Sequence, residues 1–163
     1  MEQLTVDRAL AARAVEQYGS MVLRLAFQRL KSQADAEDVG QEVFLALLRE
    51  RTFQNEDHLK RWLVRVTLHR CEDLRRSAWR RRTVPLEERT AWTAFTPEET
   101  ACLEELWSLR PKDRDVIYLH YYEGYTIAEM AELLGENPNT VSARLGRARK
   151  KLRLLMEEGM CDG

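Results

Sequence analysis

Apolar side chains recur every three or four residues along most of this chain, which is the spacing of helices with one buried face. Residues 6–30 keep this spacing, with Gly19 as the one place where the predicted helix could break. Five positions are predicted to point inward: Val15, Tyr18, Val22, Leu25 and Ala26. The pattern predicts a long first helix.

Polar residues 32–35 signal the start of a second helix, with a predicted buried stripe of Val39, Val43, Phe44, Leu47 and Leu48. Its opening turns are crowded with polar side chains: Asp35, Glu37, Asp38, Gln41 and Glu42. Acids at a helix N-terminus interact favourably with the helix dipole, which explains them without a function. They also leave an exposed acidic edge that could dock a basic partner.

A third helix is predicted over residues 58–82, after a polar segment at 54–57. Five apolar side chains lie near one side of it: Leu59, Trp62, Leu63, Val66 and Leu74. Its cations lie largely elsewhere, and a basic helix interleaved with aromatic rings is a plausible platform for single-stranded nucleic acid. For Trp62, a place in the core fits as well as stacking on a base.

The helical pattern fades over residues 83–96, where Pro85 and several acids predict an extended linker. The polar and proline residues at 96–99 then provide a capping signal for renewed helical structure. Leu103, Leu106 and Trp107 form one predicted apolar face. A further helix after Pro111 is predicted to bury Val116, Ile117, Leu119 and Tyr121, so a second small domain spans residues 97–156.

Residues 124–153 have the pattern of a helix-turn-helix. Thr126 and Glu129 form a capping box, and the first helix has its apolar face at Ile127, Met130, Ala131 and Leu134. Gly135 ends that helix, and Asn137 with Pro138 starts the next. The second helix has a predicted buried stripe of Val141, Leu145, Ala148 and Leu152.

The second of these helices is strongly basic on its other face, with six cations and no acid between residues 139 and 156. Such a density suits a phosphate backbone. In a helix-turn-helix the first turns of this helix face base edges, so the predicted readers are Asn139, Thr140, Ser142, Ala143, Arg144 and Arg147. Later cations, including Lys151, would contact phosphates. A helical hairpin with a merely solvated basic face is the alternative.

Charge is distributed in blocks, although the formal net charge is only −1. Residues 60–82 carry nine cations and two acids, whereas residues 86–107 carry six acids and one cation. Two basic segments thus flank an acidic connector, a layout that suits two nucleic-acid surfaces on one chain.

Other function classes find little support in the sequence. The three cysteines have no C-x-x-C spacing, and His69 and Cys71 fall on different sides of one helix, so we expect no metal site. We find no phosphate-binding glycine loop and no hydrolase motif, so we expect no catalysis by the chain. No signal peptide or long apolar run is evident, which favours a reduced, cytoplasmic protein.

Three segments carry a family resemblance: DAEDVGQEVFLAL at residues 35–47, F-x5-L-x2-WLxRV at 53–66, and the whole of residues 103–152. In this order and spacing they resemble the sigma-70 family of bacterial transcription initiation factors, in the extracytoplasmic-function group, which keeps only regions two and four. The resemblance covers residues 18–155. It implies an all-α protein with a region-two domain over residues 1–82, an acidic linker over 83–96 and a region-four domain over 97–163.

The resemblance also implies partners and site residues. Asp38, Gln41, Glu42 and Phe44 match the surface that binds the β′ clamp helices of core RNA polymerase, and region four is expected to meet the β flap. The −10 element, melted to single strands with one flipped base, would be bound by Phe53, Asn55, Trp62, Arg65, His69, Arg70, Arg75 and Arg76. The −35 duplex would be read by Asn139, Thr140, Ser142, Ala143, Arg144, Arg147 and Lys151.

Two departures from the family pattern concern DNA specificity. His69 stands where relatives usually carry asparagine. The two side chains offer different hydrogen-bonding groups, so the identity of the captured base is not predicted. Ser142 and Ala143 stand where a basic residue and serine are frequent. Relatives are often held by an anti-sigma factor, and no cofactor or small-molecule substrate is expected.

A helix-turn-helix repressor or activator that acts without core polymerase is the rival interpretation. It would need a ligand pocket or a symmetric interface in the N-terminal half, where the sequence instead has the acidic edge and the basic aromatic helix. Binding distinguishes the two, because a sigma factor binds core polymerase tightly and free promoter duplex poorly.

Overall fold

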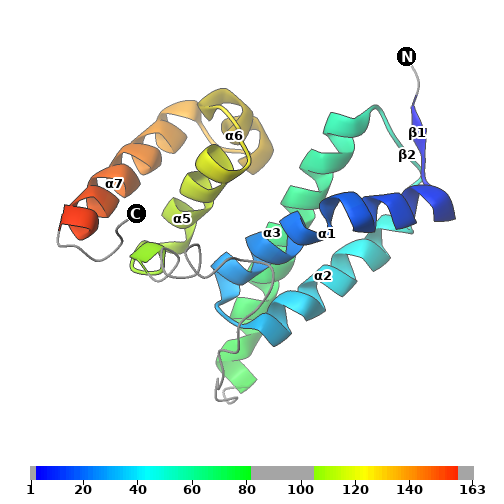
Figure 1. Ribbon diagram of the computed structural model, residues 1–163, viewed down its shortest axis with the longest axis horizontal. Helices are drawn as coiled ribbons and strands as arrows, with labels where there is room; N and C mark the ends of the chain where they lie inside the picture. The colour runs from blue at the N-terminus through cyan, green and yellow to red at the C-terminus, as the bar shows by residue number, and fades with distance from the viewer. Residues whose placement is uncertain (1–2, 82–104, 158–163) are drawn as a thin grey trace. The chain divides into compact units, whose positions relative to one another are not determined.

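The computed structural model describes residues 3–81 and 105–157, and the chain divides into two compact units, Met1–Ala94 and Phe95–Gly163. The expected linker at 83–96, the capping signal at 96–99 and Leu103 lie outside the described residues. Helices make up nearly all of each described unit (Figure 1). The prediction of an all-helical protein is confirmed, apart from one very short pair of strands.

Helix α1, Arg8–Leu30, runs without a break at Gly19. The Asp7 carboxylate caps it by accepting a hydrogen bond from the Leu10 N–H at 2.8 Å, and the chain turns at Lys31 with a φ of 61°. Four of the five side chains predicted to point inward are buried, but Val15 is 48% exposed. The prediction for Val15 was wrong because it lies at the edge of the buried face.

Helix α2, Gln33–Leu47, begins at the predicted place, with the Ser32 hydroxyl accepting from the Asp35 N–H at 3.1 Å. Val39, Val43 and Leu47 are buried and Phe44 is half-buried. Leu48 is 54% exposed, contrary to prediction, because it follows the last helical residue. The two helices approach closely: a Cβ added at Gly40 would lie 3.1 Å from Leu23 Cδ2.

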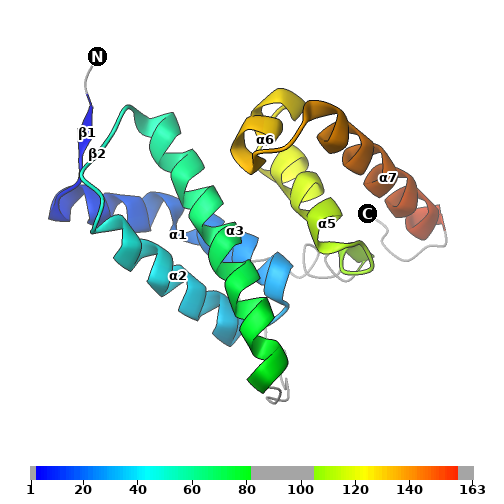
Figure 2. The same ribbon diagram turned by 180° about the vertical axis from the view of Figure 1, so that it is seen from behind.

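Helix α3, Glu56–Arg81, packs against both α1 and α2 (Figures 1 and 2). Leu59 and Leu63 are buried as predicted, whereas Val66, Leu74 and Trp62 are half-exposed. The buried face instead continues through Val64, Thr67, Leu68 and Cys71. A helix clamped between two others buries a wider face than one stripe, so the single-stripe prediction was too narrow.

Two short strands that the sequence pattern did not indicate pair antiparallel: β1, Leu4–Thr5, and β2, Thr52–Phe53. Leu4 lies opposite Phe53, and the Val6 N–H also donates to the Arg51 carbonyl at 2.9 Å. The pair holds the connection between α2 and α3 beside the start of α1. It thereby fixes the segment that leads into the basic helix.

The C-terminal unit begins its long helical stretch with α5, Pro111–Ile117, which continues into a π-helical turn, η1, Tyr118–Tyr122. Val116, Ile117 and Leu119 are buried as predicted. Tyr121 was predicted to be buried and is 60% exposed. The π turn advances the chain with a wider hydrogen-bonded loop than an α-helix, so the 3.6-residue period fails there.

Helices α6, Ile127–Leu134, and α7, Pro138–Glu157, form the predicted helix-turn-helix (Figure 2). The capping box is present, with Thr126 Oγ1 accepting from the Glu129 N–H at 3.1 Å and the Glu129 carboxylate accepting from the Thr126 N–H at 2.9 Å. Gly135 ends α6 with a φ of 68°, which favours glycine. Asn137 Oδ1 accepts from the Asn139 N–H at 2.7 Å and caps α7.

The core of this unit matches the sequence pattern closely. Met130, Ala131, Val141, Leu145 and Ala148 are buried. Leu133 is buried, while Ile127, Leu134 and Leu152 are half-buried. The buried side of α7 leaves its opposite side to solvent, as a DNA-reading helix requires.

Candidate nucleic-acid interfaces

The acidic edge of α2 is exposed. Asp38, Gln41 and Glu42 all face solvent, and Phe44 beside them is half-buried. Leu45, 59% exposed, and Leu48, 54% exposed, continue the same side of the helix. Leu45 was not predicted to be part of this surface, and Leu48 was predicted to lie in the core. Leu45 lies three residues after Glu42 and four after Gln41, and Leu48 lies three after Leu45, so this helical spacing was the signal that could have found them.

Phe53 lies under the start of α3, not on its surface. Its ring is 2% exposed and packs edge-on against His58, at a centroid distance of 5.2 Å, and against Trp62, at 5.5 Å. A ring so buried cannot stack on a base. Phe53 therefore supports the half-exposed Trp62 from beneath, which corrects the expectation of direct DNA contact.

The segment before α3 is held by two local hydrogen bonds. Asn55 Oδ1 accepts from the His58 N–H at 2.8 Å, and His58 Nδ1 accepts from the Gln54 N–H at 3.0 Å. Because Nδ1 is an acceptor, the neutral imidazole carries its proton on Nε2. Asn55 itself is exposed, so its amide group remains at the surface while its oxygen caps the helix.

The start of α3 is also anchored to α1. Glu56 accepts hydrogen bonds from Arg13, at 2.9 and 3.2 Å, and from the Tyr18 hydroxyl at 2.7 Å. The Arg13 hydrogen bond, helped by that of Tyr18, holds the pKa of the Glu56 carboxyl below its usual value. This contact fixes the helix that carries the candidate DNA-binding side chains.

Further along α3, Arg65 and His69 are exposed. Arg70 Nη1 lies 3.7 Å from the Glu42 carboxylate of α2. One ion pair therefore joins a residue of the acidic edge to a candidate DNA-binding cation. Both side chains are partly exposed, so the pair contributes little to stability.

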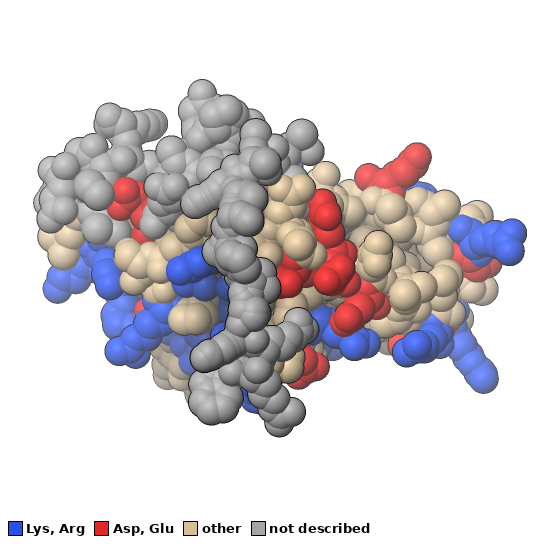
Figure 3. Space-filling model, turned by 90° about the horizontal axis from the view of Figure 1, so that it is seen from below, with Lys and Arg blue, Asp and Glu red and all other residues tan. Residues whose placement is uncertain are grey.

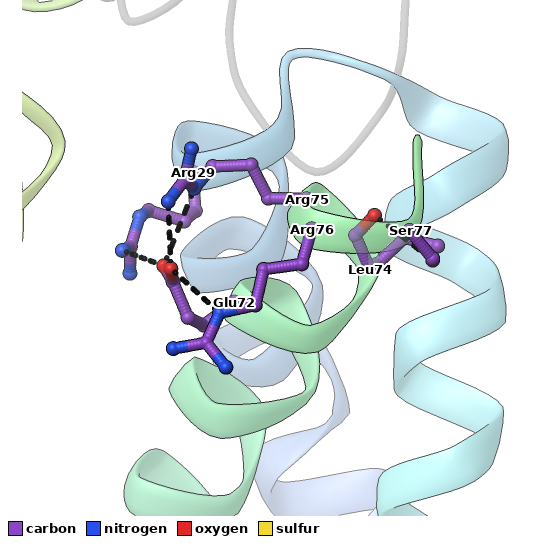
Figure 4. A network of polar contacts seen from close by, with 6 residues as sticks. All are labelled: Arg29, Glu72, Leu74, Arg75, Arg76 and Ser77. Carbon is purple, nitrogen blue, oxygen red and sulfur yellow. Dashed lines mark hydrogen bonds and ion pairs between the residues drawn. The ribbon is translucent and has the colours of Figure 1, made fainter. Parts of the chain in front are cut away.

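Arg75 and Arg76 converge with Arg29 of α1 on one acid, Glu72 (Figure 4). The Glu72 carboxylate lies 2.8 Å from Arg29 Nη2, 2.7 Å from Arg75 Nη2 and 3.6 Å from Arg76 Nε. The Arg75 hydrogen bond is the largest cause that holds the pKa of Glu72 below its usual value, with all three positive charges contributing. This Glu72 cluster gathers cations from two helices.

The expected readers at the start of α7 are accessible. Asn139, Thr140, Ser142 and Ala143 are all exposed, on the side away from the core. A Cβ at Gly146 would meet nothing within 4 Å, so the surface there is open. The first two turns therefore present small side chains, three of them polar, that a groove could approach closely.

Several α7 cations are already engaged within the unit. Arg144 lies 3.3 Å from Glu136 and is only 15% exposed, and Arg147 lies 3.2 Å from the buried Asp113. Lys151 Nζ donates to the Ser108 carbonyl at 3.2 Å, and Arg149 Nε donates to the Tyr121 hydroxyl at 2.5 Å. On the face drawn in Figure 3, basic side chains lie next to acidic ones in several places.

Neither a metal-binding cluster nor a membrane-spanning helix is found in the described part of the chain. Over residues 3–81 and 105–157, no three His, Cys, Asp or Glu side chains come together as metal ligands would. Within the same ranges, none of the helices has both the length and the apolar character needed to span a bilayer.

Comparison with protein families gives two matches. A family described as Sigma-70 region 2 matches residues 14–81, and one described as Sigma-70, region 4 matches residues 100–152. Together they cover more than half of the chain. RNA polymerase sigma factor SigV of Bacillus subtilis is 30% identical over 159 residues, which cover 94% of this chain and 95% of SigV.

Solved structures with the same fold include two complexes. CnrH, solved with the cytosolic domain of CnrY, has a TM-score of 0.67 at 26% identity, covering 93% of this chain and 90% of CnrH. The sigma factor RpoE of Bartonella quintana, solved with the anti-sigma factor NepR, has a TM-score of 0.74 at 18% identity. That match covers 90% of this chain and 96% of RpoE and shows the fold alone.

Proposed function

This chain belongs to the sigma-70 family of RNA polymerase sigma factors, in its extracytoplasmic-function group, and we propose that its two units divide the work of promoter-specific initiation. The N-terminal unit binds core polymerase and opens the −10 element, and the C-terminal unit binds the −35 element. The observation that carries this proposal is the presence of both family regions, in order, on two separate units with their own polar surfaces.

The exposed side of α2 is the proposed docking surface for the β′ clamp helices. Asp38, Gln41 and Glu42 supply charge and hydrogen bonds, and the half-buried Phe44 supplies apolar contact. The exposed Leu45 and Leu48 add apolar area that water would leave on binding. An interface with an apolar centre and a charged border is typical of specific protein association.

The proposed −10 surface follows α3. Trp62 and His69 offer rings to unstacked bases, while Arg65 and Asn55 offer hydrogen-bond donors. Extruding a base costs a few kcal/mol, and stacking on Trp62 above Phe53 would recover part of it. Three arginines further along the helix, Arg70, Arg75 and Arg76, bind phosphates beside the melted segment.

The proposed −35 reader is α7. Asn139, Thr140, Ser142 and Ala143 reach base edges from its first turns. Arg144 and Arg147 would exchange or share their acids Glu136 and Asp113 when they meet DNA, since both pairs are partly accessible. Lys151 binds phosphate at the border of the groove. The β flap of polymerase would hold the same unit in place.

The remaining assignments follow from this function. We propose domains over residues 1–82 and 97–163, with an acidic linker at 83–96. The protein acts in the bacterial cytoplasm, where polymerase performs the chemistry and the chain itself catalyses none. Because both solved relatives above were captured with a protein partner, one of them named as an anti-sigma factor, an anti-sigma factor is a proposed partner here too.

Sequencing the transcripts of cells that overproduce the protein tests this function. We expect a set of new start sites that share two upstream elements, one near −35 and one near −10. New transcripts without shared elements, or transcripts repressed at sites where the protein sits alone on duplex DNA, would instead support a repressor or activator.

A further inference from the structure

Arg149 of α7 is held differently from the other engaged arginines of that helix. Arg144 and Arg147 face carboxylates, Glu136 and Asp113. Arg149 donates its Nε–H to the Tyr121 hydroxyl at 2.5 Å, and its guanidinium carbon lies 5.6 Å from the centre of the Tyr121 ring. A phenol is neutral, so this contact fixes the guanidinium without neutralising its charge.

The Tyr121 ring is itself supported. It packs edge-on against His120, with a centroid distance of 4.8 Å and an interplanar angle of 82°. His120 Nδ1 lies 2.7 Å from the Tyr125 carbonyl, a distance at which Nδ1–H donates. Through His120, the Tyr121 ring is thereby connected to the turn that begins the helix-turn-helix. The π turn of η1 places Tyr121 outward, 60% exposed, where a regular helix would have buried it.

The geometry leaves the outer part of the guanidinium for a ligand. Nε is used by Tyr121, so the four N–H donors of the two terminal nitrogens remain for a ligand. Those nitrogens form a fork that matches two oxygens of a phosphate. At about 3.6 residues per turn, Arg153 and Ser142 lie on the same flank of α7, which adds a cation and a hydroxyl.

We infer that Tyr121 is a positioning residue that presents Arg149 to a DNA backbone phosphate at the border of the −35 groove. This inference rests on the proposed function, because it requires α7 to lie in a major groove. The phenol holds the guanidinium in a binding conformation before DNA arrives, which reduces the side-chain entropy lost on binding. The contact contributes affinity and carries no base sequence.

The test uses the holoenzyme formed by the full chain and core polymerase. The probe is a duplex bearing the upstream element that the wild-type holoenzyme selects from a randomised library, with a scrambled element as reference. Affinity is measured as a function of salt for Tyr121→Phe, Arg149→Gln and the double variant. Tyr122→Phe is the matched control, because it removes a neighbouring hydroxyl from a ring that stacks on Tyr118.

Arg149→Gln should lower affinity about tenfold on both duplexes and reduce the salt slope by about 0.9, the value of one phosphate contact. Tyr121→Phe should lower affinity about threefold, the size of one net hydrogen bond, with the slope unchanged. In the double variant, Tyr121→Phe should cause no loss of affinity beyond that of Arg149→Gln alone. Tyr122→Phe should bind DNA with the affinity of the wild type.

Several results would overturn the inference while leaving the proposed function intact. The first is a DNA affinity of Tyr121→Phe equal to that of the wild type, and the second is a loss of affinity in the double variant equal to the sum of the two single losses. The others are an unchanged salt slope for Arg149→Gln and a loss of polymerase binding instead of DNA binding. If the wild-type holoenzyme selects no element from the library, the proposed function itself fails.

Discussion

The two basic surfaces of this protein hold their arginines in different ways. In the N-terminal unit one acid, Glu72, receives three guanidinium groups from two helices (Figure 4). In the C-terminal unit Arg144 and Arg147 each have a separate acid. When several cations share one acid, the acid keeps a partner if one arginine moves to a phosphate, whereas each cation of a separate pair must give up or share its own acid. The first arrangement suits a strand that changes shape as it melts, and the second suits a regular duplex.

The largest effect should come from reversing charge on the C-terminal surface. Arg144→Glu with Arg147→Glu removes two cations and adds two anions beside DNA, and the second change also faces a carboxylate against Asp113. We expect −35-dependent transcription in run-off assays to fall more than about 100-fold, since each lost arginine contact costs roughly 1–3 kcal/mol. Binding to core polymerase should persist.

A matched control separates DNA contact from folding. Arg144→Gln with Arg147→Gln removes the cations without adding anions, and thermal unfolding of both variants shows whether the ion pairs with Glu136 and Asp113 matter for stability. Promoter use at the wild-type level by a folded charge-reversed variant would contradict the role given to α7.

The next largest effect concerns the acidic edge of α2. Gln41→Ala with Glu42→Lys should weaken association with core polymerase about 10- to 100-fold, because a hydrogen-bonding amide is lost and an exposed charge is reversed. Co-purification and titration with core polymerase measure it. Glu16→Lys, an equal charge change at an exposed position of α1, is the control and should bind normally. Unchanged yield for the double variant would count against this surface.

Removing the shared acid tests the N-terminal side of the comparison. Glu72→Gln should lower the free energy of unfolding by about 1–2 kcal/mol at neutral pH, because hydrogen bonds to charged groups are lost around the largely buried Arg29. Denaturant titration measures it. Arg76→Gln, which removes only the most exposed arginine of the Glu72 cluster, should change stability much less. Equal losses of unfolding free energy for Glu72→Gln and Arg76→Gln would show that Glu72 does not hold the cluster together.

The pH dependence gives a second test of the same acid. The pKa of Glu72 in the folded state lies below its ordinary value of 4.5. The contribution of Glu72 to the free energy of unfolding is therefore complete above pH 4.5. It is lost as the pH falls through the lowered folded-state pKa. The stability difference between the wild type and Glu72→Gln should therefore shrink in acid. A difference that stays constant from neutral pH to strong acid would contradict the ion-pair explanation.

The smallest effect is expected at the capping box. Thr126→Ala removes the side-chain acceptor for the Glu129 N–H and should destabilise the C-terminal unit by about 1 kcal/mol. Thermal unfolding measures it, and Thr126→Ser should restore the cap. A loss equal for alanine and serine would point to packing of the methyl group instead.

The helix starts were predictable because their signals are local. Ser32, Thr126 and Asn137 each accept hydrogen bonds from backbone N–H groups two or three residues away. The pair of two-residue strands was not predictable, since so short a strand shows no alternation. Tyr121 was placed wrongly because the π turn changes the period on which the prediction depended.

The candidate site was predictable in its residue types and not in its pairings. The sequence indicates that Arg147 and Arg75 lie on basic faces, and both do. It cannot indicate that Arg147 meets Asp113, 34 residues away, or that Arg29 and Arg75 share Glu72. Such pairs depend on how the helices pack. Phe53 shows the same limit, because its burial follows from a strand that the pattern does not reveal.

Footprinting of the reconstituted holoenzyme on a selected promoter tests the division of work most directly, since it records upstream protection and unpaired thymines near −10 together. With Trp62→Ala we expect upstream protection to persist while thymine reactivity is largely lost. With Arg144→Glu and Arg147→Glu upstream protection should disappear. Full opening by the tryptophan variant, or the same footprint from core polymerase without this chain, would contradict the assignment of opening to the N-terminal unit and anchoring to the C-terminal one.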